Sequence, residues 1–156
     1  MATSKAYYLP ETKYEFLDSG GDVVITLASL GAGAGRQSAD LDLGASAQPF
    51  MFRWRAWLKF ATAPVVGETV DLYLKTNDGT HYDNDDGTGD AAVSAEDKLK
   101  NLHFLGSIVV DEASSTPEFA ASGTVTIFER YVQLVFWNAT ADALSATAAD
   151  NGAYLE

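Results

Sequence analysis

Residues 51–60 read MFRWRAWLKF, and apolar residues recur at every second position of this stretch. Side chains of a β-strand point alternately to its two sides, so the pattern predicts a strand with one buried face. The opposite face holds three of the ten lysines and arginines of the chain. The expected inward set is Phe52, Trp54, Ala56, Leu58 and Phe60, and the outward set is Met51, Arg53, Arg55, Trp57 and Lys59.

Other stretches alternate in the same way or are rich in β-branched residues, and Gly, Pro, Ser, Asn and Asp clusters separate them. Segment 94–102 begins with Ser94 and has Asp97 three residues later, a capping-box pattern that predicts one short helix. About eight strands predict an all-β fold, an antiparallel two-sheet sandwich with a jelly roll as the first choice. The strand candidates are residues 22–30, 69–76, 102–111 and 124–138, the last broken near Glu129, with weaker candidates at 12–18, 39–43 and 153–156.

Length and composition predict a single domain over residues 1–156, in which residues 1–11 form a candidate N-terminal arm. The chain contains no cysteine, so disulfides and thiolate metal sites are excluded. The net charge of −12 repels nucleic acid and anionic membranes, so neither is expected as a partner. With no apolar run of membrane-spanning length and no signal-like start, we expect a soluble protein made in the cytoplasm.

Residues 81–90 read HYDNDDGTGD, and half of these positions are Asp or Asn. Neither glycine of the stretch places acidic ligands where an EF-hand requires them. A looser calcium site built from Asp83, Asp85, Asp86 and Asp90 is one interpretation, because carboxylate oxygens can converge on a turn. A solvated loop between a strand and the short helix is the interpretation that we prefer, since turns select these residue types.

Motifs that carry enzyme chemistry are absent from the sequence. The glycine cluster at residues 30–35 has neither dinucleotide-binding nor P-loop spacing. His81 and His103 are the only histidines, and no nucleophile-elbow motif accompanies them. We therefore predict a protein that is not an enzyme, with no catalytic residues, no cofactor and no metal.

Residues 130–138 are apolar on both faces of the expected strand, which points to a second covered surface. Tryptophan and arginine are enriched at the centres of protein interfaces, so association is one explanation. A loop or the N-terminal segment lying over this face is the other. The residues predicted to contact a partner are Tyr7, Tyr8, Arg53, Arg55, Trp57, Lys59, Tyr131, Gln133 and Trp137.

Several short motifs between Gly35 and Thr140 resemble a family of tailed-bacteriophage capsid decoration, or cement, proteins with a jelly-roll fold. The motifs are Gly35-Arg36-Gln37-Ser38, Arg53-Trp54-Arg55-Ala56, Thr62-Ala63-Pro64 with Gly67, Asn101-Leu102 with Phe104-Leu105-Gly106-Ser107, and Arg130-Tyr131-Val132 leading to Trp137-Asn138-Ala139-Thr140. The resemblance implies a homo-oligomer, dimer or trimer, on the outer surface of the virion. It also implies binding to the major capsid protein. Charge segregation adds the hypothesis that the cationic stripe of Arg53, Arg55 and Lys59 meets acidic capsid or neighbouring surface.

A carbohydrate- or receptor-binding jelly roll of a phage tail or fibre is the alternative function. Jelly rolls serve as lectins as well as shell proteins, so the fold does not separate the two. Trp57, Tyr73, Tyr82 and Trp137 are the aromatic residues that could stack on a sugar.

Overall fold

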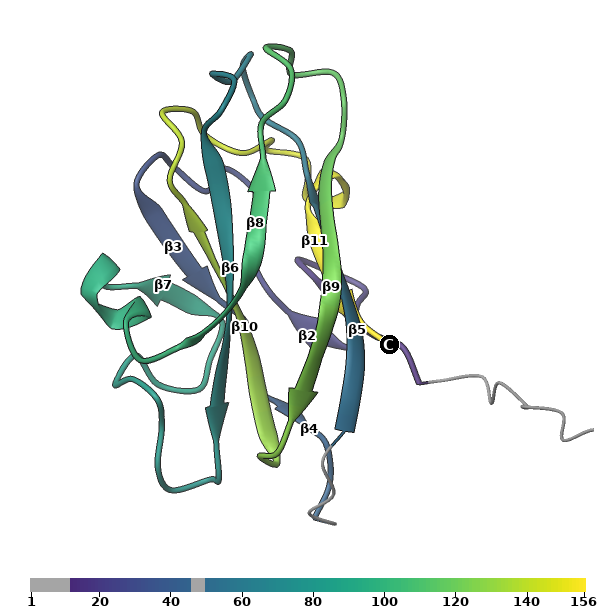
Figure 1. The fold of residues 1–156 in the computed structure, drawn as a ribbon, viewed down its shortest axis with the longest axis vertical. Helices are drawn as coiled ribbons and strands as arrows, with labels where there is room; N and C mark the ends of the chain where they lie inside the picture. Colours follow the sequence, from purple (N-terminus) through teal and green to yellow (C-terminus); the bar gives the residue numbers. More distant parts are fainter. Residues whose placement is uncertain (1–11, 46–49) are drawn as a thin grey trace, which may run out of the picture.

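The computed structural model describes residues 12–45 and 50–156, which form two β-sheets packed face to face (Figure 1). The two-sheet sandwich predicted from the sequence is confirmed, and nearly every strand pair is antiparallel. The five-stranded sheet contains, in spatial order, β2 (Val23–Val24), β1 (Tyr14–Leu17), β11 (Gly152–Leu155), β5 (Phe50–Leu58) and β9 (Phe119–Ile127).

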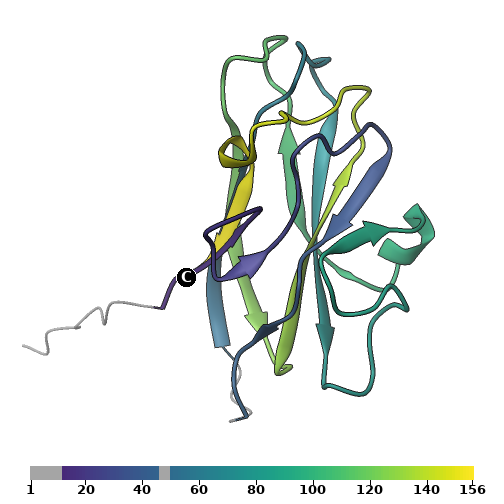
Figure 2. The same cartoon turned by 180° about the vertical axis from the view of Figure 1, so that it is seen from behind.

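The six-stranded sheet lies against the inner side of the first (Figure 2). Its order is β7 (Ala91–Val93), β3 (Ala34–Gln37), β10 (Tyr131–Asn138), β6 (Thr69–Asn77) and β8 (His103–Val109), with β4 (Leu41–Asp42) also paired to β10. Two 3₁₀ turns complete the described residues, η1 (Glu96–Leu99) and η2 (Ala148–Asp150). The proposed N-terminal arm, with Tyr7 and Tyr8, lies outside the described residues.

The buried face predicted for residues 51–60 is confirmed in β5 and in Phe60, which follows it. Side chains from Phe52 to Phe60 at alternate positions are buried, with exposed fractions from 0% to 8%. The same is true of β6, where Val70, Leu72 and Leu74 are 0–2% exposed. These residues meet the inward side of β10 in one hydrophobic core between the sheets. Burying each such side chain stabilises the fold by about 1.5–3 kcal/mol, so this core is the main source of stability.

Two predictions of local structure are wrong. Only Val23–Val24 of the expected strand at 22–30 is a strand, and it pairs in parallel with β1. The backbone leaves the ladder there because the chain crosses from one sheet to the other: the amide of Ala39, next to the six-stranded sheet, bonds the carbonyl of Val24. The expected helix is a short 3₁₀ turn whose N-cap position is Ala95, which makes no side-chain hydrogen bond to the turn, while the Ser94 hydroxyl donates to the Asp86 carboxylate.

Each of the three tryptophans lies directly opposite a glycine on the neighbouring strand. A Cβ atom placed on these glycines would lie 2.6–2.8 Å from the facing indole, closer than real Cβ contacts allow. The indole therefore occupies the space that a side chain would take on the adjacent strand. The pairs are Trp54 with Gly123, Trp57 with Gly152, and Trp137 with Gly35.

Replacing Gly123 by alanine is expected to lower the free energy of unfolding by about 1–3 kcal/mol, the usual cost of overpacking a filled core. Trp54 is only 4% exposed, so its buried indole cannot easily move away from the added methyl group. Gly31→Ala is the matched control, because nothing lies within 4 Å of its Cβ position. Urea unfolding of both variants measures the difference, and equal stability of the two would contradict the role assigned to the indole.

Candidate functional site

Residues between 91 and 102 of the chain itself cover part of the outer side of β10 in the six-stranded sheet. Val93, Leu99 and Leu102 form a second small hydrophobic cluster with Val135 on the outer side of β10. Tyr73 and Trp137 pack against the same cluster. The apolar second face of β10 is thus explained by an internal cover, one of the two explanations left open by the sequence.

Lys75, on the outer side of β6, is fully buried beneath this cover. Its ammonium group donates to the Gln37 side-chain oxygen at 3.1 Å and to the Gly87 carbonyl at 2.5 Å. The Gln37 amide in turn donates to the carbonyls of Asp86, Gly87 and Gly89 at 3.0–3.1 Å. Two buried side chains of the sheet therefore bind the backbone of the acidic loop directly.

The charge of Lys75 is surrounded by carboxylates. Burial lowers the pKa of Lys75, and the nearby charges of Asp86, Asp40 and Asp83 act in the opposite direction. An unpaired ammonium is costly to bury, so these acidic side chains compensate the desolvation of Lys75. Many of the acidic residues in HYDNDDGTGD thus surround a cation that belongs to the protein itself.

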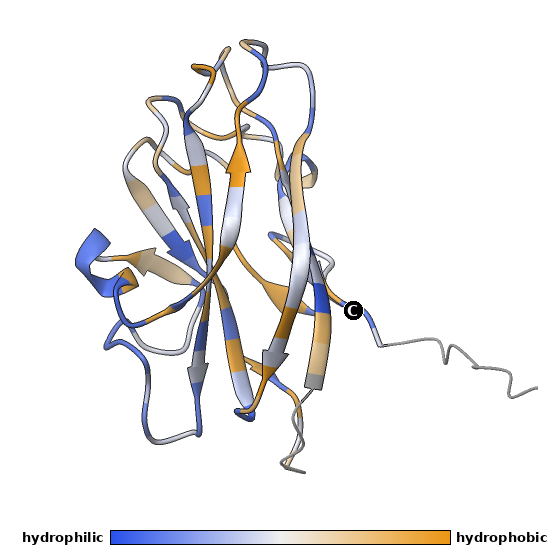
Figure 3. Cartoon of the chain, in the orientation of Figure 1, coloured by the Kyte–Doolittle hydropathy of each residue, from blue (hydrophilic) through white to orange (hydrophobic). Residues whose placement is uncertain are grey.

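The four aspartates considered for calcium do not converge on one point. Each is already bonded to a different protein donor, and the described residues hold no group of three or more metal-ligating side chains. The loop is strongly hydrophilic beside the alternating strands that flank it (Figure 3). The bonds are Asp83 with Thr76, Asp85 with Lys98, Asp86 with Ser94, and Asp90 with Arg36 and Thr26.

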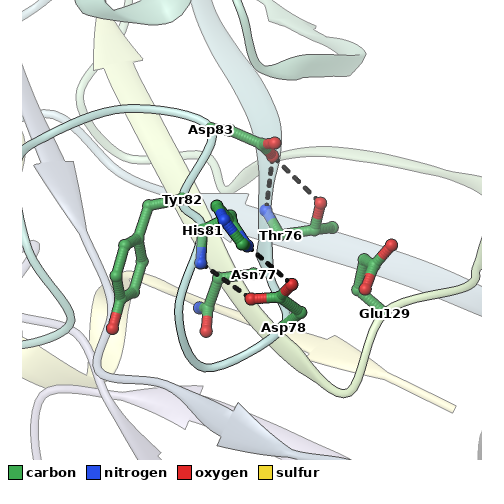
Figure 4. A pocket seen from close by; sticks show the side chains of 7 residues that line it. All are labelled: Thr76, Asn77, Asp78, His81, Tyr82, Asp83 and Glu129. Carbon is green, nitrogen blue, oxygen red and sulfur yellow. Dashed lines mark hydrogen bonds and ion pairs between the residues drawn. The ribbon is translucent and has the colours of Figure 1, made fainter.

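A small pocket lies where the acidic loop leaves the end of β6 (Figure 4). Its volume is about 180 Å³, and its walls include Tyr82, His81 and Asp78. The Asp78 carboxylate accepts hydrogen bonds from two loop amides and contacts the His81 ring at 3.0 Å, which lowers the pKa of Asp78 and raises that of His81. Most polar groups of the pocket thus serve to close the turn.

The predicted interface residues of β10 do not form an open surface. Gln133 is fully buried and donates to the Ser38 carbonyl, so the prediction that it contacts a partner is wrong for the chain as it stands. Tyr131 and Trp137 are half-buried, the first beneath Arg130 and the second over Gly35. Alternation identified these side chains as outward-facing but carried no information about the loop above them.

The outer face of the five-stranded sheet presents the remaining predicted residues. Arg53 is exposed, and Arg55 and Trp57 are half-exposed beside Tyr154 of β11. Strand β9 adds only small outward side chains, including Ser122 opposite Arg55 and Thr124 opposite Arg53. We call the surface made by Arg53, Arg55, Trp57, Ser122 and Thr124 the arginine face.

Lys59 is distinct from the two arginines. Its ammonium group forms an ion pair with Asp150 at 3.1 Å. Neither Arg53 nor Arg55 has an ion pair with any residue that the structure describes. Glu156, which follows the neighbouring strand β11, lies opposite Arg53, and the two residues exchange backbone hydrogen bonds at 2.8 Å.

Two strongly exposed apolar residues are not among the contact residues predicted from the sequence. Met51 is 77% exposed and Phe128 is 70% exposed, more than the other large apolar residues that the structure describes. Met51 pairs with Thr126 of β9, and Phe128 follows that strand, so both lie at the same end of the sandwich. We call this surface the apolar end. The outward position of Met51 was readable from its strand, whereas no periodic signal singles out Phe128.

Comparison with known proteins adds no further assignment: neither a protein-family model nor a curated protein matches the chain. Among the described residues, no helix has the length and apolar character needed to cross a bilayer. Function therefore rests on the surfaces just described.

Lys75→Met is expected to lower the free energy of unfolding by about 1–3 kcal/mol, because it leaves buried acceptors of Gln37 and Gly87 without their donor. Residues 78–90 should also become sensitive to limited proteolysis. Lys98→Met removes a surface pair to Asp85 and is the control, with an expected loss of about 0–1 kcal/mol. Equal losses in the two variants would show that Lys75 does not hold the loop.

Calcium is expected to leave the melting temperature unchanged, since the loop carboxylates are engaged by protein donors. A ligand at 100 times its Kd would stabilise the native state by about 2.7 kcal/mol, which a thermal scan resolves easily. Scans with millimolar calcium and with chelator should superimpose. A reproducible increase with calcium would restore the loop as a metal site.

Proposed function

We propose that this chain is a structural virion protein that decorates and stabilises a bacteriophage capsid. It binds the major capsid protein and neighbouring copies of itself on the outer surface of the shell. The observation that carries the proposal is the apolar end, where Met51 and Phe128 are left exposed. Large apolar side chains gathered on a soluble protein mark contact surfaces, because exposing them to water is unfavourable.

The strand pairing supports a jelly-roll topology, as the decoration family implies. Setting aside β2, β4 and β7, which have two or three residues each, eight longer strands remain. The first of these pairs with the last, and the nesting continues inward to the middle of the chain. The pairs are β1 with β11, β3 with β10, β5 with β9, and β6 with β8. A long antiparallel ribbon rolled into two sheets gives this arrangement.

The mechanism is thermodynamic. A protein that binds only the assembled shell stabilises it by mass action, in proportion to the logarithm of its free concentration over Kd. A shell presents the same contact many times, so modest individual contacts produce high avidity when copies also touch one another. No chemical step is required of the bound protein.

A carbohydrate-binding function is the second candidate, and the pocket beside Tyr82 favours it. Tyr82 is 42% exposed and lines the same pocket as Asp78 and Asp83 (Figure 4). An aromatic ring next to acidic acceptors could stack on a sugar and bind its hydroxyls. Against this, Asp78 and Asp83 already accept hydrogen bonds from the loop and from Thr76, which leaves them less available to a ligand.

The test is co-sedimentation with capsids of the encoding phage prepared without this protein. Wild-type protein should bind saturably, at a fixed number of copies per shell, and raise the melting temperature of the capsid. The double variant Met51→Ser, Phe128→Ser should bind at least about tenfold more weakly, because burying one such side chain contributes about 1.5–3 kcal/mol.

Val24→Ser is the matched control, since Val24 is 45% exposed on β2 and belongs to neither surface. It should bind like wild type. Absence of wild-type binding to every capsid form would refute the decoration role. Specific retention on a glycan array, lost on Tyr82→Ala, would support the carbohydrate-binding candidate.

A further inference from the structure

Nearly all described lysines and arginines are neutralised within the chain. Ion pairs join six of them to an acidic side chain, and Lys75 lies in its buried network. Arg53 and Arg55 alone among the described cations lack such a partner. In a protein with a net charge of −12, two arginines on one face of a strand that form no ion pair with a described residue are a local exception. The ion pairs are Lys13 with Glu15, Arg36 with Asp90, Lys59 with Asp150, Lys98 with Asp85, Lys100 with Asp97, and Arg130 with Asp42.

A complementary surface lies at the end of the sandwich opposite the apolar end. The loops 59–68 and 110–118 run side by side there, joined by Gly67 N to Val110 O at 2.8 Å and Val110 N to Glu68 O at 2.9 Å (Figures 1 and 2). Segments 60–70 and 110–118 contain no lysine or arginine. We call this surface the acidic tip; its exposed residues include Val65, Val66, Asp111, Glu112 and Glu118.

The acidic tip combines charge with exposed apolar area. Val65 and Val66 are each 55% exposed. Asp111, Glu112 and Glu118 form no ion pair with any residue in the described part of the chain. The tip therefore offers both an apolar contact and negative charge.

The two surfaces cannot neutralise each other within one chain. Arg53 lies five residues before Leu58, where β5 ends near the tip, which corresponds to about 16 Å at the rise of a strand. This exceeds the screening length of about 8 Å at physiological ionic strength. Charges of opposite sign on separate surfaces of one molecule can instead meet on two molecules.

We propose that copies of this chain bind one another head to side, with the acidic tip of one copy against the arginine face of the next. Asp111 and Glu112 meet Arg53 and Arg55, and the exposed valines pack beside Trp57. Such a contact is heterologous, so it builds a ring when the rotation closes and a chain of subunits when it does not. The inference rests on the proposed function, because it identifies the surfaces that join neighbouring copies, but it can be tested without capsids.

Two charge-reversed variants isolate the two sides of the contact. Size-exclusion chromatography with light scattering at low salt should show wild type larger than a monomer, returning to monomer as salt screens the contact. Arg53→Glu with Arg55→Glu, and separately Asp111→Lys with Glu112→Lys, should each be monomeric. The second variant lowers the net negative charge, so general repulsion cannot explain its dissociation.

Lys98→Glu with Lys100→Glu is the control for net charge, because it changes the charge by the same amount as the arginine variant on a different surface. It should associate like wild type. Circular dichroism and melting curves establish that each variant is folded.

Mixing the two monomeric variants is the decisive measurement. The first keeps an intact tip and the second an intact arginine face, and the reversed charges of their other two surfaces also have opposite signs, so an equimolar mixture should regain association. Wild type that stays monomeric, an arginine variant that associates normally, or a mixture that stays monomeric would each overturn the inference. None of these outcomes involves the apolar end, so capsid binding is decided separately by co-sedimentation.

Discussion

Each tryptophan faces a glycine across a strand pair, and this steric match fixes the register of both sheets. Slipping a strand by one residue would turn all its side chains to the other face and place each indole against a residue with a Cβ atom. Trp54 and Trp57 point to opposite sides of β5, so their glycines fix that strand from both faces. The outward position of Arg53 and Arg55 follows from this register.

The outer faces of the two sheets differ in what lies against them. The six-stranded sheet holds the buried Lys75 and Gln37, which bind the backbone of the acidic loop. The loop held by that network lies over the outer side of β10, where Gln133 and Val135 are fully buried. Within the described part of the chain, the outer side of the five-stranded sheet carries small β9 side chains and the two arginines Arg53 and Arg55, which form no ion pair there. The partner contacts that we propose therefore use this sheet and the ends of the sandwich.

Period-two alternation was enough to predict the sandwich, the long strands and their inward residues. It placed Val70, Leu72 and Leu74 correctly because burial between two sheets follows strand geometry alone. It failed for Gln133 and gave no sign that Lys75 is buried, because a loop distant in sequence covers that face. Alternation also gave no sign that the chain passes from one sheet to the other after Val24. The residues that follow are still apolar and buried, although the strand has ended.

Charge segregation has a consequence for assembly. Two copies that each carry −12 repel one another at long range, and screening confines that repulsion to about 8 Å in physiological salt. In the association that we propose, a pair of arginines meets two carboxylates at the contact, and this local attraction opposes the averaged repulsion. Because the two charged surfaces lie on different parts of the molecule, a copy that binds one neighbour leaves its other surface free for a second. In the proposed arrangement, each added copy forms one contact and leaves a second surface free for the next copy, as a repeated lattice requires.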